Sequence, residues 1–168
     1  LPTELAEKGY SVVPAPRQVE LTGKEVNIGS NWSVEGKNIR KHHIAMKTLL
    51  DDLSDWYGME LVQNRSSTPK IRLSTDEDAV QTRAGSEIDK QGYLLRITPS
   101  LIEIIGNSEQ GLFYGVQTLV QLIKPASGGR LLLPGGIIKD WPSARLRFIH
   151  SNIKYHQPRL KTLKRYLD

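Results

Sequence analysis

The chain has 168 residues, of which 38% are hydrophobic and 24% charged, so it is about the size of one ordinary domain and can form a core. It contains no cysteine, which excludes disulfides, thiolate nucleophiles and cysteine-ligated metals. No segment approaches the roughly 18 uninterrupted apolar residues of a membrane span, and the first residues lack the basic and apolar regions of a signal peptide. We therefore expect no membrane span and no signal peptide within this chain. The absence of a signal peptide does not argue against export, because a mature protein would begin in the same way.

The net charge is +5, from 23 Lys and Arg against 18 Asp and Glu. This positive charge is scattered except for one cluster near the C-terminus, whose spacing places it on the solvent side of a helix. No aromatic-rich recognition motif accompanies the charge, so we predict no nucleic-acid partner. The cluster consists of Lys154, Arg159, Lys161, Lys164 and Arg165.

The first 35 residues have the pattern of short strands broken by Pro and Gly. We predict strands over Tyr10–Val13, Val19–Leu21 and Val26–Ile28, with a turn at 14–16. From Lys37 the pattern changes, because apolar residues recur near helical spacing until Gly58 supplies a C-terminal stop. This spacing predicts an amphipathic helix of about five turns.

The middle of the chain contains the clearest strand signal. Short strands are predicted at 61–62 and 71–73, and the charged, poorly periodic segment Ser74–Lys90 is predicted to lie at the surface. The runs Gly92–Ile97 and Leu101–Ile105 are joined by Thr-Pro-Ser, which predicts a hairpin.

A second helix is predicted after this hairpin. Ser108 is a suitable N-cap, and the strongly apolar run that follows continues until Pro125, so this helix should be mostly buried. Short strands are expected at 131–133 and 137–138. The order of elements predicts an α+β fold with a mixed or antiparallel sheet and two helices packed on one face.

A different unit is expected to begin after Pro142. Arg147–His150 has the pattern of a strand, and Pro158–Leu167 that of a helix with proline in its first turn. We therefore predict a non-catalytic domain at 1–142 and, at 143–168, the start of a second domain that is cut off inside this helix.

The most acidic segment of the chain is Asp76-Glu77-Asp78. Paired carboxylates act as acid and base or nucleophile in glycosidases. This run, however, lies in a polar connection with no apolar surroundings to raise a pKa. We predict that it is solvated and not catalytic, and we interpret Asp51-Asp52 on the first helix in the same way.

The other motifs that could carry chemistry also favour structural roles. Neighbouring residues of a helix point in different directions, so His42 and His43 make a poor metal site, and no further ligand stands at zinc-like spacing. From their spacing alone, we expect His150 and His156 to lie at the surface or to pack against neighbouring side chains. Segment 106–111 has the glycine spacing of a phosphate loop but lacks the Lys and Ser or Thr that should follow. No serine lies in a nucleophile elbow. We predict no catalytic residue, no metal and no cofactor in this chain.

Two segments carry a family resemblance. Gly111–Leu122, with the sequence GLFYGVQTLVQL, resembles a helix in the domain that precedes the barrel of glycoside hydrolase family 20, the β-N-acetylhexosaminidases. Its glycines at 111 and 115 lie on one helical face and would permit close approach to a neighbouring element. Ile138–Pro142, followed by Arg147 and the run to Asp168, looks like the family's linker and the first strand and helix of its TIM barrel. Related domains also precede the barrels of families 84 and 67.

The resemblance implies a secreted or periplasmic enzyme that acts on glycans containing N-acetylhexosamine. In that family, an arginine on the first barrel strand binds sugar hydroxyls, and Arg147 occupies the matching place. Its planar guanidinium suits paired hydroxyl acceptors. The family's substrate-assisted reaction uses a glutamate and an aspartate from a later barrel strand, and nothing in this chain matches them. The chain departs from the pattern at Phe148, Asn152 and Tyr155, which stand where glycine, aspartate and arginine are usual.

The resemblance therefore implies a non-catalytic accessory domain, inactive alone, whose partners are the barrel of the same parent chain and, through it, a glycan. Two alternatives remain open. One is a free-standing carbohydrate-binding or protein-interaction module, although Trp32, Trp56 and Trp141 fall in three separate elements and form no recognisable aromatic platform. The other is part of a degenerate glycosidase or one of different specificity.

Overall fold

A computed structural model describes residues 3–40, 43–63, 68–82 and 86–144. They form one eight-stranded sheet whose main path runs β1-β8-β5-β6-β4-β2-β3, with β7 paired to β8. Neighbours from β1 to β6 in this path are antiparallel, whereas β6, β4, β2 and β3 are parallel. The mixed sheet and the two long helices confirm the predicted α+β class.

The elements fall into two long helices, two short helices, a 3-10 turn and eight strands in the described part of the chain. Their bounds are α1 Glu4–Glu7, β1 Gln18–Ile28, β2 Ser33–Lys37, α2 Ile44–Tyr57, β3 Val62–Gln63, β4 Lys70–Thr75, α3 Ser86–Asp89, β5 Tyr93–Ile97, β6 Leu101–Gly106, α4 Glu109–Leu122, β7 Lys124–Ala126, η1 Ser127–Gly129 and β8 Arg130–Asp140.

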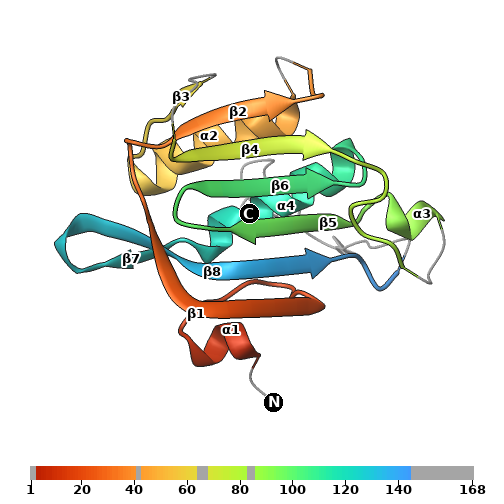
Figure 1. Ribbon diagram of the computed structural model, residues 1–168, viewed down its shortest axis with the longest axis horizontal. Coiled ribbons are helices and arrows are strands. Elements are labelled where there is room, and N and C mark those ends of the chain that lie inside the picture. The colour runs from red at the N-terminus through yellow and green to blue at the C-terminus, as the bar shows by residue number, and fades with distance from the viewer. Residues whose placement is uncertain (1–2, 41–42, 64–67, 83–85, 145–168) are drawn as a thin grey trace, which may run out of the picture.

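The core lies between the sheet and the two long helices, which both cover the face turned away from the viewer in Figure 1. Side chains of a strand point alternately to the two faces. In β4, Ile71 and Leu73 are fully buried, and in β6 the same holds for Ile102 and Ile104. Helix α4 packs on β4, β5 and β6 and against α2. It therefore forms the centre of the helical layer.

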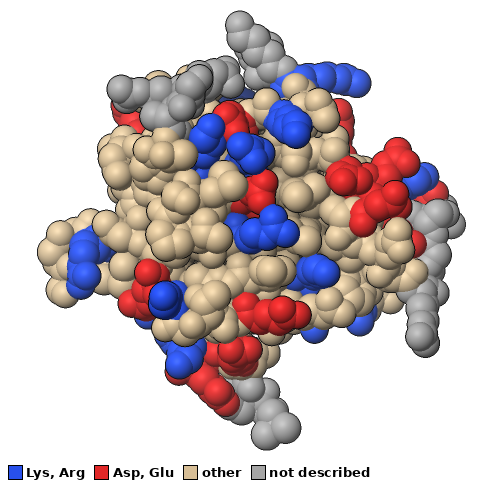
Figure 2. Space-filling model, in the orientation of Figure 1, with Lys and Arg blue, Asp and Glu red and all other residues tan. Residues whose placement is uncertain are grey.

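The opposite face of the sheet carries a chain of ion pairs. Lys70 and Arg72 contact Glu35 at 3.0 and 2.7 Å, and Arg72 and Arg96 contact Glu103 at 3.1 and 2.7 Å. These charges occupy the middle of the face shown in Figure 2. Neighbouring Arg72 and Lys70 lower the pKa of the Glu35 carboxyl. Every charge in the chain of pairs has a partner of opposite sign, as expected for a face turned towards solvent.

The predicted hairpin and second helix are confirmed. β5 and β6 pair antiparallel, with Tyr93 opposite Gly106 and Ile97 opposite Ile102. Helix α4 begins after Ser108, whose hydroxyl accepts hydrogen bonds from the backbone N–H groups of the next turn. Both elements are set by local patterns, alternation in the strands and a capped apolar run in the helix.

Four predicted short strands are in fact two long ones. β1 and β8 each have 11 residues, and they pair antiparallel along most of their length. The register places Leu21 opposite Gly136 and Glu25 opposite Pro134. β1 therefore has three residues where β8 has one, an irregularity of the β-bulge kind. The Gly and Pro residues that suggested strand ends lie in this irregularity.

Two further predictions were wrong near the N-terminus. Tyr10–Val13 forms no strand, although Tyr10 is buried. The first long helix begins at Ile44 and not at Lys37, because residues 33–37 form β2, which pairs parallel with β4. The helix stops at Gly58 in the left-handed conformation, as predicted.

The predicted second domain, with its strand at 147–150 and helix at 158–167, lies outside the described residues. In the described part of the chain, no helix is both long and apolar enough to cross a membrane.

Candidate functional site

A groove of about 490 Å³ opens where β8 ends, and it is larger than a second hollow among the described residues. Segment 12–14 forms one side and the outer face of α4 another, with Tyr114, Gln117 and Gln121 at helical spacing. The remaining lining comes from Gln91, from Tyr93 on β5 and from residues 140–144 at the end of β8. Most of this lining is apolar or aromatic, with amide and carboxyl groups between.

Asp140 supplies the carboxyl group among the residues that line this groove. Its Oδ1 accepts the backbone N–H of Arg17 at 3.2 Å. Burial raises the pKa of the Asp140 carboxyl, against the lowering effect of hydrogen bonds from the backbone of Arg17 and Trp141. Close by, the hydroxyls of Tyr93 and Thr118 are 2.5 Å apart and buried. Burial also raises the pKa of Tyr93, so its hydroxyl stays protonated at neutral pH.

Arg17 fixes the segment that leaves β8. Its guanidinium lies 5.3 Å from the centre of the Trp141 ring, a cation–π arrangement. Its Nε donates to the Trp141 carbonyl at 2.9 Å, and a terminal nitrogen donates to Ser143 Oγ at 2.6 Å. These contacts hold residues 141–143 against the start of β1, so the direction in which the chain leaves the sheet is defined.

Polar contacts connect the groove to both of its flanks. Gln121 Oε1 accepts the backbone N–H of Val13 at 2.9 Å. Gln117 Nε2 lies 3.4 Å from Asp52 Oδ2 on helix α2. Burial raises the pKa of the Asp52 carboxyl, and the nearby charges of Asp51 and Asp55 add to this effect. The predicted solvated role of Asp51-Asp52 therefore needs correction at Asp52, which is half-buried.

The second hollow, of about 290 Å³, lies beside Tyr10 and Glu25. The Tyr10 hydroxyl donates to Glu25 Oε1 at 2.7 Å, and Lys124 Nζ lies 3.2 Å from the same oxygen and 4.3 Å from the centre of the Tyr10 ring. The hydrogen bond from Tyr10 and the charge of Lys124 lower the pKa of Glu25. Each of these three groups has its polar partner within the cluster, so we assign the cluster a structural role at the edge of the sheet formed by β1.

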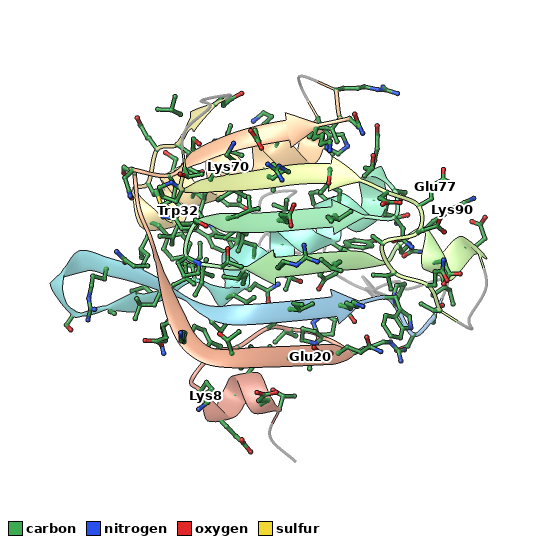
Figure 3. The ribbon with its side chains drawn as sticks, in the orientation of Figure 1. Lys8, Glu20, Trp32, Lys70, Glu77 and Lys90 are labelled. Atoms are coloured by element: carbon green, nitrogen blue, oxygen red, sulfur yellow. The ribbon has the colours of Figure 1, made fainter. Side chains whose placement is uncertain are left out.

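The acidic run lies where the sequence placed it, in an exposed turn after β4. Figure 3 shows Glu77 at this end of the sheet, pointing away from it. Asp76 Oδ1 accepts the N–H of Asp78 at 3.1 Å, a hydrogen bond within the turn. That the run is not catalytic stays a prediction.

His43 has a structural role, whereas His42 lies outside the described residues. The Nδ1 atom of buried His43 accepts the backbone N–H of Ala45 at 3.1 Å and caps α2. Its Nε2 is 3.7 Å from Glu109 Oε2. Within residues 3–40, 43–63, 68–82 and 86–144, no group of three or more His, Asp or Glu could hold a metal ion. Arg147, His150 and His156 lie outside these ranges.

Two carboxyl groups predict opposite pH effects on stability. The raised pKa of Asp140 means that the folded state binds the proton of this carboxyl more tightly than the unfolded state does. The free energy of unfolding therefore falls as the pH rises above 3.8, the ordinary pKa of the group. Glu35 has a lowered pKa and contributes stability that is lost as pH falls below its ordinary value of 4.5.

We expect Asp140→Asn to be more favourable relative to the wild type at pH 7 than at pH 4, because the cost of a buried carboxylate is removed. Glu35→Gln should show the reverse trend, losing its ion pairs at pH 7 and less at pH 4. Urea unfolding of the three proteins at both pH values measures these differences. Parallel pH profiles for the two variants would contradict the assignment.

Comparison with known proteins places this fold in a family. The model of glycosyl hydrolase family 20, domain 2, matches residues 9–141. The chain is 27% identical to a beta-hexosaminidase of Porphyromonas gingivalis, over 96% of this chain and 21% of that protein. It is 25% identical to a beta-hexosaminidase of Vibrio furnissii, over 94% of this chain and 24% of that protein. It thus spans less than a quarter of the length of these curated relatives.

Solved structures of the family share this fold. The chitobiase of Flavobacterium johnsoniae superposes with a TM-score of 0.72 at 18% identity, over 96% of this chain and 25% of that one, a likeness of fold. A beta-hexosaminidase of Streptomyces plicatus gives a TM-score of 0.61 at 30% identity, over 77% of this chain and 26% of that one. Since the family model covers most of the described sheet and both long helices, this chain belongs to glycosyl hydrolase family 20, of which it carries domain 2.

Proposed function

We propose that this chain is a non-catalytic accessory domain of a secreted or periplasmic β-N-acetylhexosaminidase, which hydrolyses glycans containing N-acetylhexosamine. Its partner is a catalytic TIM barrel that begins at about residue 143 of the same parent chain. Membership of the family supports the enzyme class, and the names of the curated relatives support the reaction. The short share of those relatives that this chain spans is compatible with an accessory part.

One observation carries the accessory role: the described residues bring together no pair of carboxyl groups able to act as acid and base. Asp140 lies alone in its groove, and Glu35 and Glu103 are each neutralised by cations. A glycosidase normally requires two catalytic groups flanking the scissile bond, or a substrate acetamido group with an acid. The arrangement of carboxyl groups in the described part of the chain therefore supports a scaffold role.

The two faces of the sheet suggest how such a scaffold attaches to its barrel. On the ion-paired face, each charged side chain of the pairs already contacts a side chain of opposite charge. The helical side instead offers the groove, with exposed Val13 and half-buried Tyr114 and Trp141. Burial of apolar surface drives association, so the helical side is the more suitable docking face.

We further propose that Arg147 binds hydroxyls of the terminal sugar, as the family resemblance implies. The experiment compares hydrolysis of a panel of chromogenic N-acetylglucosaminides by this 168-residue chain and by the full-length parent protein. We expect activity in the parent only, and its loss in the parent's Arg147→Ala variant. Arg130→Ala is the matched control, because Arg130 lies exposed on β8 and donates to the Ser127 carbonyl.

Hydrolysis by the isolated chain would overturn the accessory role. An Arg147→Ala parent that keeps wild-type kcat/KM would overturn the assignment of Arg147 alone. If the parent hydrolyses none of the panel, the N-acetylglucosaminide substrate class is wrong, and a different specificity or a degenerate barrel takes its place.

A further inference from the structure

The chain leaves the sheet at a point where strand pairing ends. Strand β8 ends at Asp140, and the pair of Tyr93 with Asp140 is the last one in its ladder with β5. On the other side of β8, the ladder with β1 ends at the pair of Gln18 with Lys139. Residues 141–144, which we call the exit segment, therefore continue beyond the hydrogen-bonded sheet, and other contacts fix their path.

Arg17 supplies such contacts from the position directly before β1. In the antiparallel register of β1 and β8, Arg17 stands opposite Asp140, and its backbone N–H donates to Asp140 Oδ1 at 3.2 Å. Its guanidinium reaches further, to the Trp141 carbonyl at 2.9 Å and to Ser143 Oγ at 2.6 Å. One residue of the N-terminal part thus holds the end of β8 and two positions of the exit segment.

The exit segment is stiff between the two positions that the Arg17 side chain contacts. Pro142 lies between Trp141 and Ser143, and a proline fixes its own φ and restricts the residue before it to extended conformations. The planar guanidinium donates in a fixed fork geometry. The contacts of Arg17 therefore define the direction of the exit segment as well as its position.

These contacts have less consequence for folding than for direction. Arg17 is exposed, and the acceptors of its side chain are a carbonyl and a hydroxyl on an exposed part of the chain. Each such hydrogen bond replaces one to water, so its net contribution to stability is modest. Removal of the Arg17 side chain should leave the domain folded and should loosen the exit segment.

We propose that Arg17 is a positioning residue of the parent enzyme: by holding Trp141 and Ser143, it sets the place and direction at which the chain passes from this domain to the unit that binds the sugar. The inference rests on the proposed function, in which Arg147, four residues after Ser143 in the sequence, binds sugar hydroxyls. It deepens that function, because it gives the accessory domain a part in substrate affinity. Arg17 acts through the exit segment and not on the substrate.

The test measures kcat and KM for a chromogenic N-acetylglucosaminide with the full-length parent protein and its Arg17→Ala variant. A group that binds the sugar equally in the ground state and the transition state contributes to KM, so its displacement raises KM. We expect Arg17→Ala to raise KM by about tenfold and to leave kcat within about twofold, a smaller loss than the roughly hundredfold that a 1 Å misplacement can cost. Unfolding of the variant would instead lower kcat and leave KM unchanged, because fewer molecules would be active.

Two further variants complete the test. Arg17→Lys keeps the positive charge but lacks the fork geometry, so its KM should lie between those of the wild type and Arg17→Ala. Arg130→Ala is the matched control, since Arg130 is an exposed arginine at the other end of β8, and it should keep the wild-type KM.

A wild-type KM in Arg17→Ala, a fall in kcat alone, or an equal rise in KM in Arg130→Ala would overturn the positioning role and leave the accessory role intact. A parent protein that hydrolyses none of the panel would overturn the proposed function and this inference with it. The two failures are therefore distinguishable.

Discussion

Replacing Gly111 by alanine is expected to lower the free energy of unfolding by about 3 kcal/mol, the upper end of the cost of overpacking a core. A Cβ atom at this position would lie 2.2 Å from the carbonyl oxygen of Gly92 and 3.2 Å from that of Lys90. Both are backbone atoms beside β5, so helix α4 would have to move off the sheet. This loss outweighs the roughly 1 kcal/mol that alanine gains over glycine in a helix.

Two substitutions on the same helix serve as controls, with urea unfolding as the measurement. A Cβ at Gly115 would lie 2.5 Å from Ile104 Cγ2 and 3.2 Å from the Tyr93 ring, and these are side-chain atoms, so Gly115→Ala should cost less than Gly111→Ala. Gln110→Ala lies on the exposed side and should change stability by less than about 0.5 kcal/mol. A Gly111→Ala protein as stable as the wild type would contradict close packing at this position.

The parts of the fold that sequence could predict are those set by local pattern. The β5–β6 hairpin is encoded within a few residues by alternation and a short turn, and α4 by Ser108 and an apolar run. The spacing of Gly111 and Gly115 also predicted close approach to a neighbouring element, and their crowded surroundings confirm it. The hairpin and the helix start are set within about fifteen residues of chain, whereas the partners that crowd Gly111 are Gly92 and Lys90 from the segment before the hairpin.

The parts that sequence missed depend on distant partners. β1 is one strand only because β8, more than a hundred residues later, continues its ladder on both sides of the irregularity. β2 has the sequence SVEGK, which contains a glycine and two charges, and its strand form comes from parallel pairing with β4. Tertiary pairing of this kind overrides local strand propensity.

The groove illustrates the same limit for the candidate site. The sequence marks Asp140 only as part of the segment Ile138–Pro142, and nothing near it in the sequence indicates burial. Its environment comes from Arg17 and Tyr93, which are far from it in the chain. A usable signal is the acid that ends β8, two positions after buried Ile138, since a carboxyl group at a buried strand end is a candidate for a raised pKa.

A buried asparagine gives the second large expected effect, and it lies under a segment that was predicted to be surface. Val80 is only 3% exposed, although it belongs to the charged stretch 74–90. Asn107 holds it there: its Oδ1 accepts the Val80 N–H at 2.9 Å, and its Nδ2 donates to the Val80 carbonyl. The Asn107 N–H donates to the Gly92 carbonyl at 2.9 Å. One side chain thus satisfies both backbone groups of a buried residue.

Asn107→Ala is therefore expected to lower the free energy of unfolding by about 3 kcal/mol, because a buried donor and a buried acceptor each lose a partner at roughly 1–3 kcal/mol. The amide of Val80 should also exchange its hydrogen faster in the variant, which separates loss of this contact from general destabilisation. Asn27→Ala is the control, since Asn27 is exposed on β1 and should change stability by less than about 0.5 kcal/mol. If Asn107→Ala unfolds like the control and Val80 keeps its protection, the segment after β4 is held by the apolar contacts of Val80 alone.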